Sequence, residues 1–236
     1  IISAGTSIDS CRRLLVLADS YPIIHVGLGL HPADLTGWVS AENEAELRDL
    51  ASHPKVVEWS ETGLDYMPNS PPHDLQQDAF RKQIRIAKGL GLPIVIHSRE
   101  ADADTLRLLN EEGAGEVGGA WHYFQGDLEL AERVIDLGFY ISLAKPLLRI
   151  PELEEAVKQI PLQNIVIETD SYPQPFKKNP LRRTEPWHLP QVAEKLAAIQ
   201  QTDIETVAST TTTNYLQLLN GRIDPEALPL PISEAP

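Results

Sequence analysis

The feature that most constrains this chain is the regular alternation of short apolar runs with longer amphipathic stretches from end to end. The apolar runs are short and continuous, a pattern typical of buried parallel strands rather than exposed antiparallel ones. The stretches between them have helical spacing, so the chain has the pattern of repeated βα units. We therefore expect strands at residues 1–6, 23–31, 56–61, 93–97, 119–124, 139–144 and 165–170.

Helical stretches lie between these strands, and two more follow the last one. They are predicted at residues 9–20, 42–52, 74–90, 102–112, 127–137, 151–159, 186–200 and 203–219. Asp9 and Asp127 are placed to cap two of these helices, and Gly138 stands where a helix stops before a strand. Seven strands alternating with helices suit either a doubly wound sheet or a TIM-type (β/α)8 barrel that lacks one unit. No Gly-x-Gly-x-x-Gly follows a strand, which disfavours a dinucleotide-binding sheet, so an α/β barrel is predicted.

Length and composition further limit the domain organisation and the class of protein. We expect residues 1–220 to form one barrel domain and the proline-rich residues 221–236 to form a C-terminal tail. The single cysteine, Cys11, excludes an intramolecular disulfide framework and a cysteine-rich zinc module. No stretch approaches the ~20 apolar residues of a membrane span and no charged leader precedes an apolar run, so we expect a cytoplasmic protein without membrane contact. The net charge of −14 argues against a long basic surface for nucleic acid, but it allows local phosphate binding by a few arginines or metal ions.

Four of the expected strands end in a polar side chain that follows an apolar run. These side chains are Glu61, His97, His122 and Asp170. In a parallel barrel all strand carboxyl ends lie on one face, so two imidazoles and two carboxylates would meet there. That donor set suits a divalent metal such as zinc, manganese or magnesium, which lowers the pKa of bound water and polarises a phosphoryl or carbonyl oxygen. The alternative for each residue taken alone is a helix cap or a satisfied loop contact.

Three further residues are candidates for contacting a substrate on the same face. His31 closes the second expected strand just before Pro32, where the alternative is a turn residue preceding a proline. Arg99 follows His97 by two positions, and Arg183 belongs to a basic run after the last strand. That run also contains Lys177, Lys178 and Arg182. Because arginine binds phosphate oxygens through two parallel hydrogen bonds, local phosphate recognition is expected.

Two more acidic residues lie in the strands that end in Glu61 and Asp170. Glu58 lies three residues before Glu61 and has the opposite strand parity to it, and Glu168 precedes Asp170 in the last expected strand. We therefore expect both to face the helical layer, each paired with a basic side chain.

Several short segments, in order along the chain, resemble the TatD-type metal-dependent DNase family. The resemblance is carried by residues 61–66, 93–101, 122–126 and 168–170, with two further matches at 29–32 and 183–186. It runs from about residue 1 to residue 219. Several motifs in order over such a span are far more specific than any one of them.

The resemblance implies a (β/α)8 barrel of the amidohydrolase-like kind with one to three divalent cations, Mg, Mn or Zn, at the strand carboxyl ends. It implies hydrolysis of phosphodiesters, with 3′–5′ exonuclease and DNA-repair-associated activity on DNA ends or another phosphodiester substrate. Carried over, Glu61 would bind or bridge metal, and His97 and His122 would be imidazole ligands. Asp170 would bind metal and help to deprotonate the attacking water. Arg99, Arg183 and His31 would contact the substrate.

The sequence also departs from the family pattern. The family's first strand carries an Asp-x-His-x-His motif, whereas the seven histidines of this sequence include no His-x-His pair. The match begins at the family's second strand, so either the first βα unit lies outside the sequence or this is a degenerate member. Ser60 stands where glycine usually precedes the metal glutamate, and the turn around Lys145 is altered.

Three functions remain open on the sequence alone. The leading hypothesis is a metal-dependent phosphodiesterase that cleaves DNA ends with metal-activated water. The second is a non-catalytic scaffold or binding protein that has lost part of its metal site. The third is a Schiff-base enzyme that uses Lys145 after the sixth strand, but this leaves the four metal-type residues unexplained. The oligomeric state is not predicted.

Overall fold

The computed structural model describes residues 1–172, 178–179 and 183–227. Seven parallel strands form one sheet in the order β1 to β7, each next to its neighbour in sequence. They are β1 (Ile2–Ala4), β2 (His25–Gly27), β3 (Val56–Asp65), β4 (Ile94–Arg99), β5 (Gly119–Trp121), β6 (Phe139–Leu143) and β7 (Ile165–Ile167). Within the described ranges no strand joins β7 to β1, so the sheet is an open barrel. The predicted α/β barrel architecture with seven strands is confirmed.

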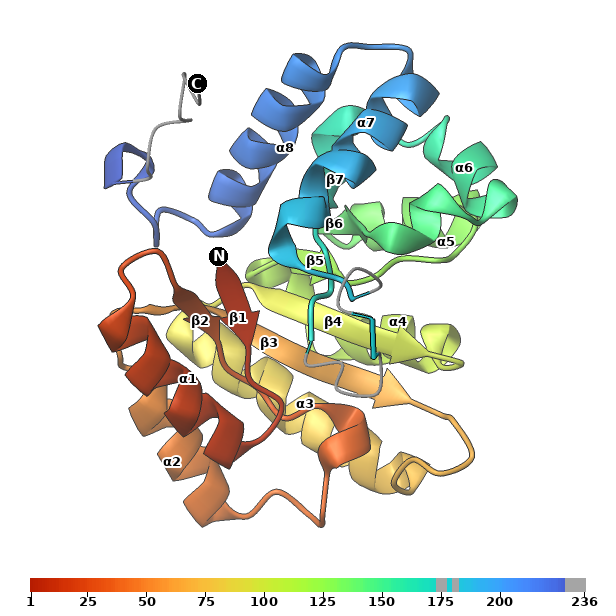
Figure 1. Cartoon of the computed structure of the whole chain (residues 1–236). Coiled ribbons are helices and arrows are strands. Elements are labelled where there is room, and N and C mark those ends of the chain that lie inside the picture. Colours follow the sequence, from red (N-terminus) through yellow and green to blue (C-terminus); the bar gives the residue numbers. More distant parts are fainter. Residues whose placement is uncertain (173–177, 180–182, 228–236) are drawn as a thin grey trace.

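Helices separate most of the strands and pack on the outside of the sheet (Figure 1). They are α1 (Ile8–Ser20), α2 (Ala41–Leu50), α3 (His73–Leu90), α4 (Asp102–Glu111), α5 (Leu128–Asp136), α6 (Pro151–Val157), α7 (Leu189–Gln200) and α8 (Ile204–Leu218). Asp127 caps α5 as predicted, accepting from the N–H of Leu130. The cap of α1 is Ser7 rather than Asp9, because the Ser7 hydroxyl accepts from the N–H of Ser10 and leaves Asp9 in the first turn.

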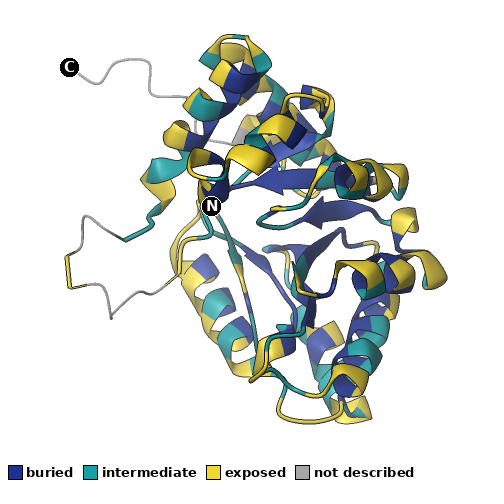
Figure 2. Cartoon of the chain, turned by 90° about the vertical axis from the view of Figure 1, so that its right-hand side faces the viewer, coloured by how far each residue is buried: buried dark blue, intermediate teal, exposed yellow. Residues whose placement is uncertain are grey.

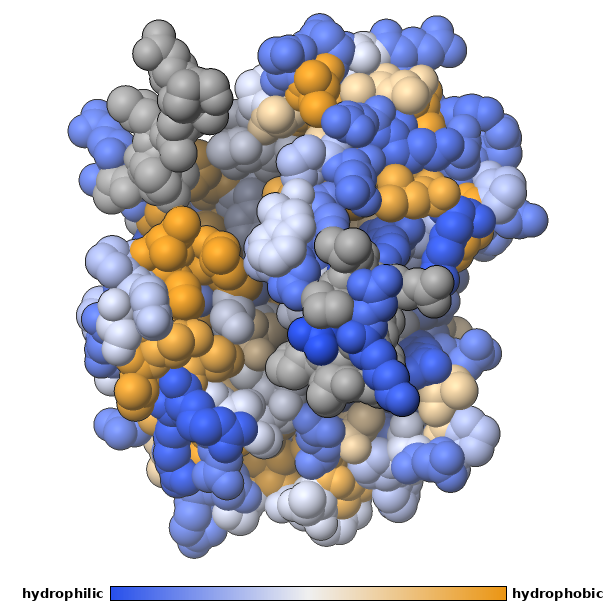
Figure 3. All heavy atoms as spheres, viewed as in Figure 1, coloured by the Kyte–Doolittle hydropathy of each residue, from blue (hydrophilic) through white to orange (hydrophobic). Residues whose placement is uncertain are grey.

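Strands β2 to β7 are largely buried, as their continuous apolar runs predict, whereas no residue of β1 is buried (Figure 2). Between the strands and the helices lies one large apolar core, and a smaller cluster packs the end of α8 onto β3, β5 and β7. On the face seen in Figure 3, hydrophobic residues gather over α1 and β1 at the left. None of the helices in the described part of the chain is both long enough and apolar enough to span a membrane.

Strand β3 is ten residues long and continues four residues past its predicted end at Glu61. The extension pairs with β4, with Gly63 opposite His97 and Asp65 opposite Arg99. Gly63 has a φ of +147°, and a Cβ atom there would lie 1.9 Å from the carbonyl oxygen of His97. Only glycine therefore lets the two strands approach closely enough to continue their ladder as far as Asp65.

Glu58 is a buried carboxyl in the middle of β3. Its Oε1 accepts a hydrogen bond from the Ser60 hydroxyl (2.8 Å), and its Oε2 contacts the phenol of Tyr215 on α8 (2.9 Å). The prediction that a basic side chain would pair with it is therefore wrong, because two neutral hydroxyls satisfy the carboxyl. Burial raises the pKa of Glu58 from 4.5 to about 7, which the two hydrogen bonds only partly offset.

This buried carboxyl makes stability depend on pH. Since its pKa is 4.5 unfolded and about 7 folded, the native state binds more protons between these values. The free energy of unfolding therefore falls as pH rises through this window. Glu58→Gln, which keeps the shape and the hydrogen bonds, should stabilise the protein by up to about 3 kcal/mol at about pH 8 and by little at about pH 4.5.

Urea unfolding of both proteins at the two pH values measures the difference. Glu132→Gln, at an exposed position on α5, is the control for loss of one carboxyl charge. A Glu58→Gln protein that gains nothing over wild type at the higher pH would contradict the assignment.

Candidate metal centre

The polar side chains at the strand ends come together at one end of the sheet. Glu61 lies on β3 and His97 on β4, while His122 directly follows β5. Asp170 lies three residues beyond the end of β7, and His31 lies beyond β2 at the start of a short 3-10 helix, η1 (Pro32–Asp34). All five are partly buried. The shared end of the sheet follows from the parallel arrangement, which brings every strand carboxyl end to the same face.

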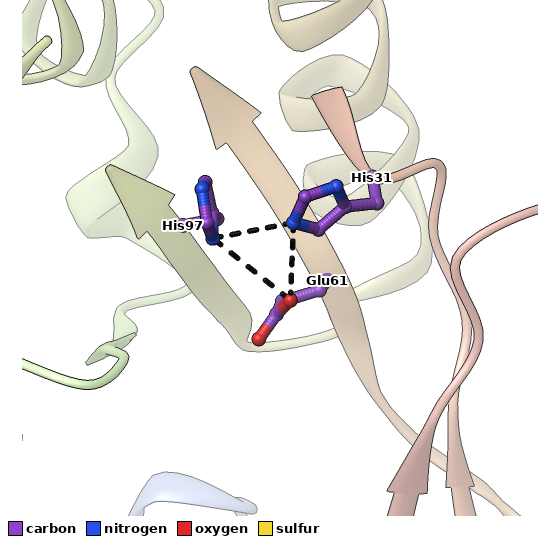
Figure 4. A group of neighbouring side chains, drawn as sticks. All are labelled: His31, Glu61 and His97. Carbon is purple, nitrogen blue, oxygen red and sulfur yellow. Dashed lines mark hydrogen bonds and ion pairs between the residues drawn. The ribbon is translucent and has the colours of Figure 1, made fainter. Parts of the chain in front are cut away.

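Three of these residues form a compact group (Figure 4). The Nε2 atom of His31 lies 3.2 Å from Nδ1 of His97 and 3.5 Å from Oε2 of Glu61. Nδ1 of His97 lies 4.0 Å from the same Glu61 oxygen. One potential ligand atom from each residue lies within 4.8 Å of the other two, which is compatible with a shared divalent ion.

The second oxygen of Glu61 faces a different pair. Its Oε1 lies 2.8 Å from Nε2 of His122, and this nitrogen lies 4.0 Å from Oδ1 of Asp170. The two carboxylate oxygens of Glu61 are thus directed at two separate donor groups. A carboxylate in this position is able to bridge two ions, and the donor set of imidazole nitrogens and carboxylate oxygens fits divalent metals.

Two further carboxylates orient the imidazoles. Oδ2 of Asp65 lies 3.2 Å from Nε2 of His97, which directs Nδ1 of that ring at Glu61. Oε1 of Glu168 lies 2.8 Å from Nδ1 of His122, which directs Nε2 inward. Carboxylates that hold the outer nitrogen of a histidine ligand in this way set its tautomer and raise its basicity.

Neither orienting residue was expected in this role. Glu168 was predicted to face the helical layer, and this is wrong because it lies just past the end of β7 at Ile167, where its carboxylate contacts Nδ1 of His122. Its carboxylate also accepts the N–H of Tyr123 at 2.7 Å, which holds it beside His122. Asp65 has the same strand parity as Glu61. It was missed because the expected strand ended at Glu61, whereas β3 continues for four more residues.

His31 differs from the other two histidines in its hydrogen bonding. The N–H of Ala33 donates to Nδ1 of His31 at 3.1 Å, so the neutral ring carries its proton on Nε2. Nε2 is then a hydrogen-bond donor that points at His97 and Glu61. His31 would have to give up the bond from Ala33 to act as a metal ligand through Nε2, whereas it is already arranged to donate to an anion.

Burial and the neighbouring charges shift the titration of the centre. Burial by itself would raise the pKa of Glu61, but His122 and then His97 and His31 hold its pKa at about 2. Burial and the ring of His31 lower the pKa of His97 to about 4, so this ring is neutral near pH 7. Burial opposes protonation of His122, yet Glu168 and Glu61 raise its pKa well above 6.5. His122 would therefore have to release a proton for its Nε2 to hold a metal ion.

The basic candidates lie at the edge of the centre. Arg99 is exposed as the last residue of β4, and in the described part of the chain no contact joins its side chain to the donor groups. Arg99 lies two residues after His97 on the same strand, so its side chain projects to the same side of the sheet as that of His97. Arg183 lines a pocket together with Thr169, the neighbour of Asp170. The predicted basic residues 177 and 182 lie outside the described residues.

The carboxylate of Asp65 should control metal affinity without itself binding the ion. In Asp65→Asn the amide keeps the local turn contacts but loses the charge that makes His97 a stronger donor. We expect divalent-metal affinity to fall about 10–100-fold. Titration of Zn²⁺ and Mn²⁺ against a competing chelator measures this effect.

A matched control is available in the same region. Asp104→Asn changes an aspartate on α4 that contacts Tyr66 and Arg107 rather than the centre, and it should leave affinity unchanged. Equal metal affinity in wild type and in Asp65→Asn would show that Asp65 does not support the site.

Comparison with known proteins places this arrangement in a family. Residues 1–220 match the family model described as TatD related DNase. The chain is 36% identical over 223 residues to the uncharacterised metal-dependent hydrolase YabD of Bacillus subtilis strain 168, covering 92% of this chain and 86% of that protein. It is 32% identical over 225 residues to the 3′-5′ ssDNA/RNA exonuclease TatD of Escherichia fergusonii, covering 92% and 86%. The crystal structure of YjjV, a TatD homologue from Escherichia coli K12, superposes with a TM-score of 0.84 at 27% identity, covering 93% and 86%. This chain is therefore a member of the TatD-related DNase family of metal-dependent hydrolases.

Proposed function

We propose that this protein hydrolyses phosphodiester bonds of DNA, removing nucleotides from 3′ ends with metal-activated water. The observation that carries the proposal is the position of Glu61, whose two carboxylate oxygens face His31 and His97 on one side and His122 and Asp170 on the other. Divalent metal held by these groups would stabilise the charge that develops on a phosphoryl group. The similarity to a relative named as a 3′-5′ ssDNA/RNA exonuclease supports the choice of substrate.

In this proposal Glu61, His97, His122 and Asp170 hold the metal. Imidazole nitrogens favour zinc or manganese over magnesium, which prefers carboxylate and water oxygens. When bound, the metal lowers the pKa of a water molecule and polarises the phosphoryl oxygen. Asp65 and Glu168 keep the two imidazoles in the tautomers that expose a lone pair to the centre.

The remaining residues act on the proton and on the phosphate. Burial raises the pKa of Asp170 to about 6, which makes its carboxylate a competent proton acceptor near neutral pH. In this proposal the Nε2–H of His31 and the guanidinium of Arg99 donate hydrogen bonds to phosphate oxygens on the same face. Charge-assisted bonds of this type orient the diester for attack.

The first test removes a proton acceptor and a metal ligand. Asp170→Asn and His122→Ala should each lower kcat on a 3′-labelled single-stranded oligonucleotide by about 100-fold or more with metal present. Lys158→Gln, a change of a surface lysine paired with Glu155, is the control and should keep full activity. Wild-type rates in both site variants would refute the proposal.

Two further measurements distinguish an enzyme from a non-catalytic scaffold. Elemental analysis of purified wild-type protein should show near-stoichiometric divalent metal, and a 3′-blocked oligonucleotide should resist degradation. Metal-free protein with no activity on any oligonucleotide after metal addition favours the scaffold.

The second test concerns His31, whose ring donates from Nε2. His31→Ala should lower kcat/KM about 10–100-fold while metal content stays at the wild-type level, since the variant removes a phosphate donor and no ligand. His97→Ala should lower both quantities, because Nδ1 of His97 directs its lone pair into the centre and is a proposed metal ligand. Metal content and steady-state rates measured on the two purified variants distinguish these roles. Loss of metal in His31→Ala would reassign it as a ligand.

A further inference from the structure

A small pocket lies beside the candidate centre, between the ends of β6 and β7 and the start of α7. Its volume is about 160 Å³, and Thr169 connects it directly to Asp170. It is lined by Lys145, Leu148, Thr169, Arg183, Thr184, His188, Gln191 and Val192. Pockets for whole drug-sized ligands measure about 300–1,000 Å³, so this one suits a single small group rather than an entire nucleotide.

The charge of the pocket differs from that of the rest of the chain. Three of its lining residues are basic types, and none is an aspartate or glutamate, in a chain of net charge −14. Lys145 begins the 3-10 helix after β6, Arg183 lies in the loop after β7, and His188 ends the 3-10 helix before α7. Two threonine hydroxyls and the Gln191 amide add neutral hydrogen-bond donors. Such a lining is complementary to a phosphate group.

The tautomer of His188 also favours an anion. Its Nδ1 accepts a hydrogen bond from the N–H of Glu185 at 2.9 Å. The neutral ring therefore carries its proton on Nε2 and is a donor at that atom. His188 is partly buried, so its orientation is held by this local bond rather than by solvent.

An exposed aromatic side chain stands next to the pocket. Trp187 is 71% exposed, and its ring centre lies 5.8 Å from that of His188. A large indole that is left in solvent beside a cationic pocket is the combination that binds single strands, because a base stacks on the ring while the pocket holds a phosphate. Tyr172, which follows Asp170 by two residues, is also exposed, at 53%.

We propose that the Lys145–Arg183–His188 pocket binds the backbone phosphate next to the bond that is cleaved, and that Trp187 stacks on the adjoining base. This inference rests on the proposed function and specifies its substrate as a single-stranded nucleic acid longer than one phosphodiester. It also gives Lys145 a role as a cation in the turn that departs from the family pattern. The lysine would act through its charge, and no covalent bond to it is required.

The test compares a chain substrate with one that has a single phosphate. For an unstructured oligonucleotide, Lys145→Gln and Trp187→Ala should each raise KM about tenfold, as the loss of one charge-assisted or stacking contact implies. For bis(4-nitrophenyl) phosphate, which has no neighbouring phosphate, kcat/KM should stay unchanged. Lys145→Arg should keep wild-type KM because the charge remains, and Lys158→Gln is the matched loss of a lysine elsewhere.

The salt dependence of KM distinguishes the loss of a phosphate contact from a general structural change in the variant. The slope of log KM against log salt should decrease by about 0.7 in Lys145→Gln, the value for one lost phosphate contact on a single strand. It should stay unchanged in Trp187→Ala. An equal loss on both substrates, or an unchanged salt slope in Lys145→Gln, would overturn the pocket assignment.

Failure of the proposed function is recognised separately, because wild-type protein would then cleave neither substrate. Calorimetric titration of inorganic phosphate into metal-free protein still tests whether the pocket binds phosphate. Wild type and Lys158→Gln should bind phosphate with equal affinity, and Lys145→Gln should bind it about tenfold more weakly. Equal binding by all three proteins would overturn the inference, whatever the enzyme acts on.

Discussion

The centre depends on a single largely buried carboxylate, Glu61, placed among imidazole rings. Desolvation disfavours its charge, and it remains ionised only because His122, His97 and His31 surround it. Two of these neighbours, His122 and His97, are also the imidazoles proposed to hold a metal ion. An arrangement of this kind suits a cation, because a metal ion would displace the proton that His122 shares with Glu61.

Strand β3 provides the framework for this carboxylate. It is the longest strand of the sheet, and it carries Glu58 in its interior, Glu61 at the centre and Asp65 at its end. The close approach at Gly63 keeps β3 paired with β4 up to Asp65, which in turn orients His97. One strand therefore positions the Glu61 carboxylate in the centre and the Asp65 carboxylate against His97, so the paired sheet fixes the relative positions of these groups.

The positions of the strand-end residues were predictable for a simple reason. A short apolar run followed by a polar residue marks the end of a parallel strand, and all such ends share one face, so the convergence of Glu61, His97 and His122 required no knowledge of the loops. Residues beyond the strands were harder to place. Glu168 was predicted to face the helical layer, but β7 ends at Ile167 and the chain beyond it places the Glu168 carboxylate beside His122.

The sequence by itself determined the order of the βα units and the donor types at the strand ends, because periodicity and residue chemistry are local properties. Tertiary structure decided which nitrogen of each histidine faces the centre, since Asp65, Glu168 and the N–H of Ala33 come from other segments or from turn geometry. It also decided that Lys145, Arg183 and His188 share a pocket, although up to 43 positions separate them in the chain. Hydrogen bonds and charges act through space, so their partners are settled only when the packing brings distant segments together.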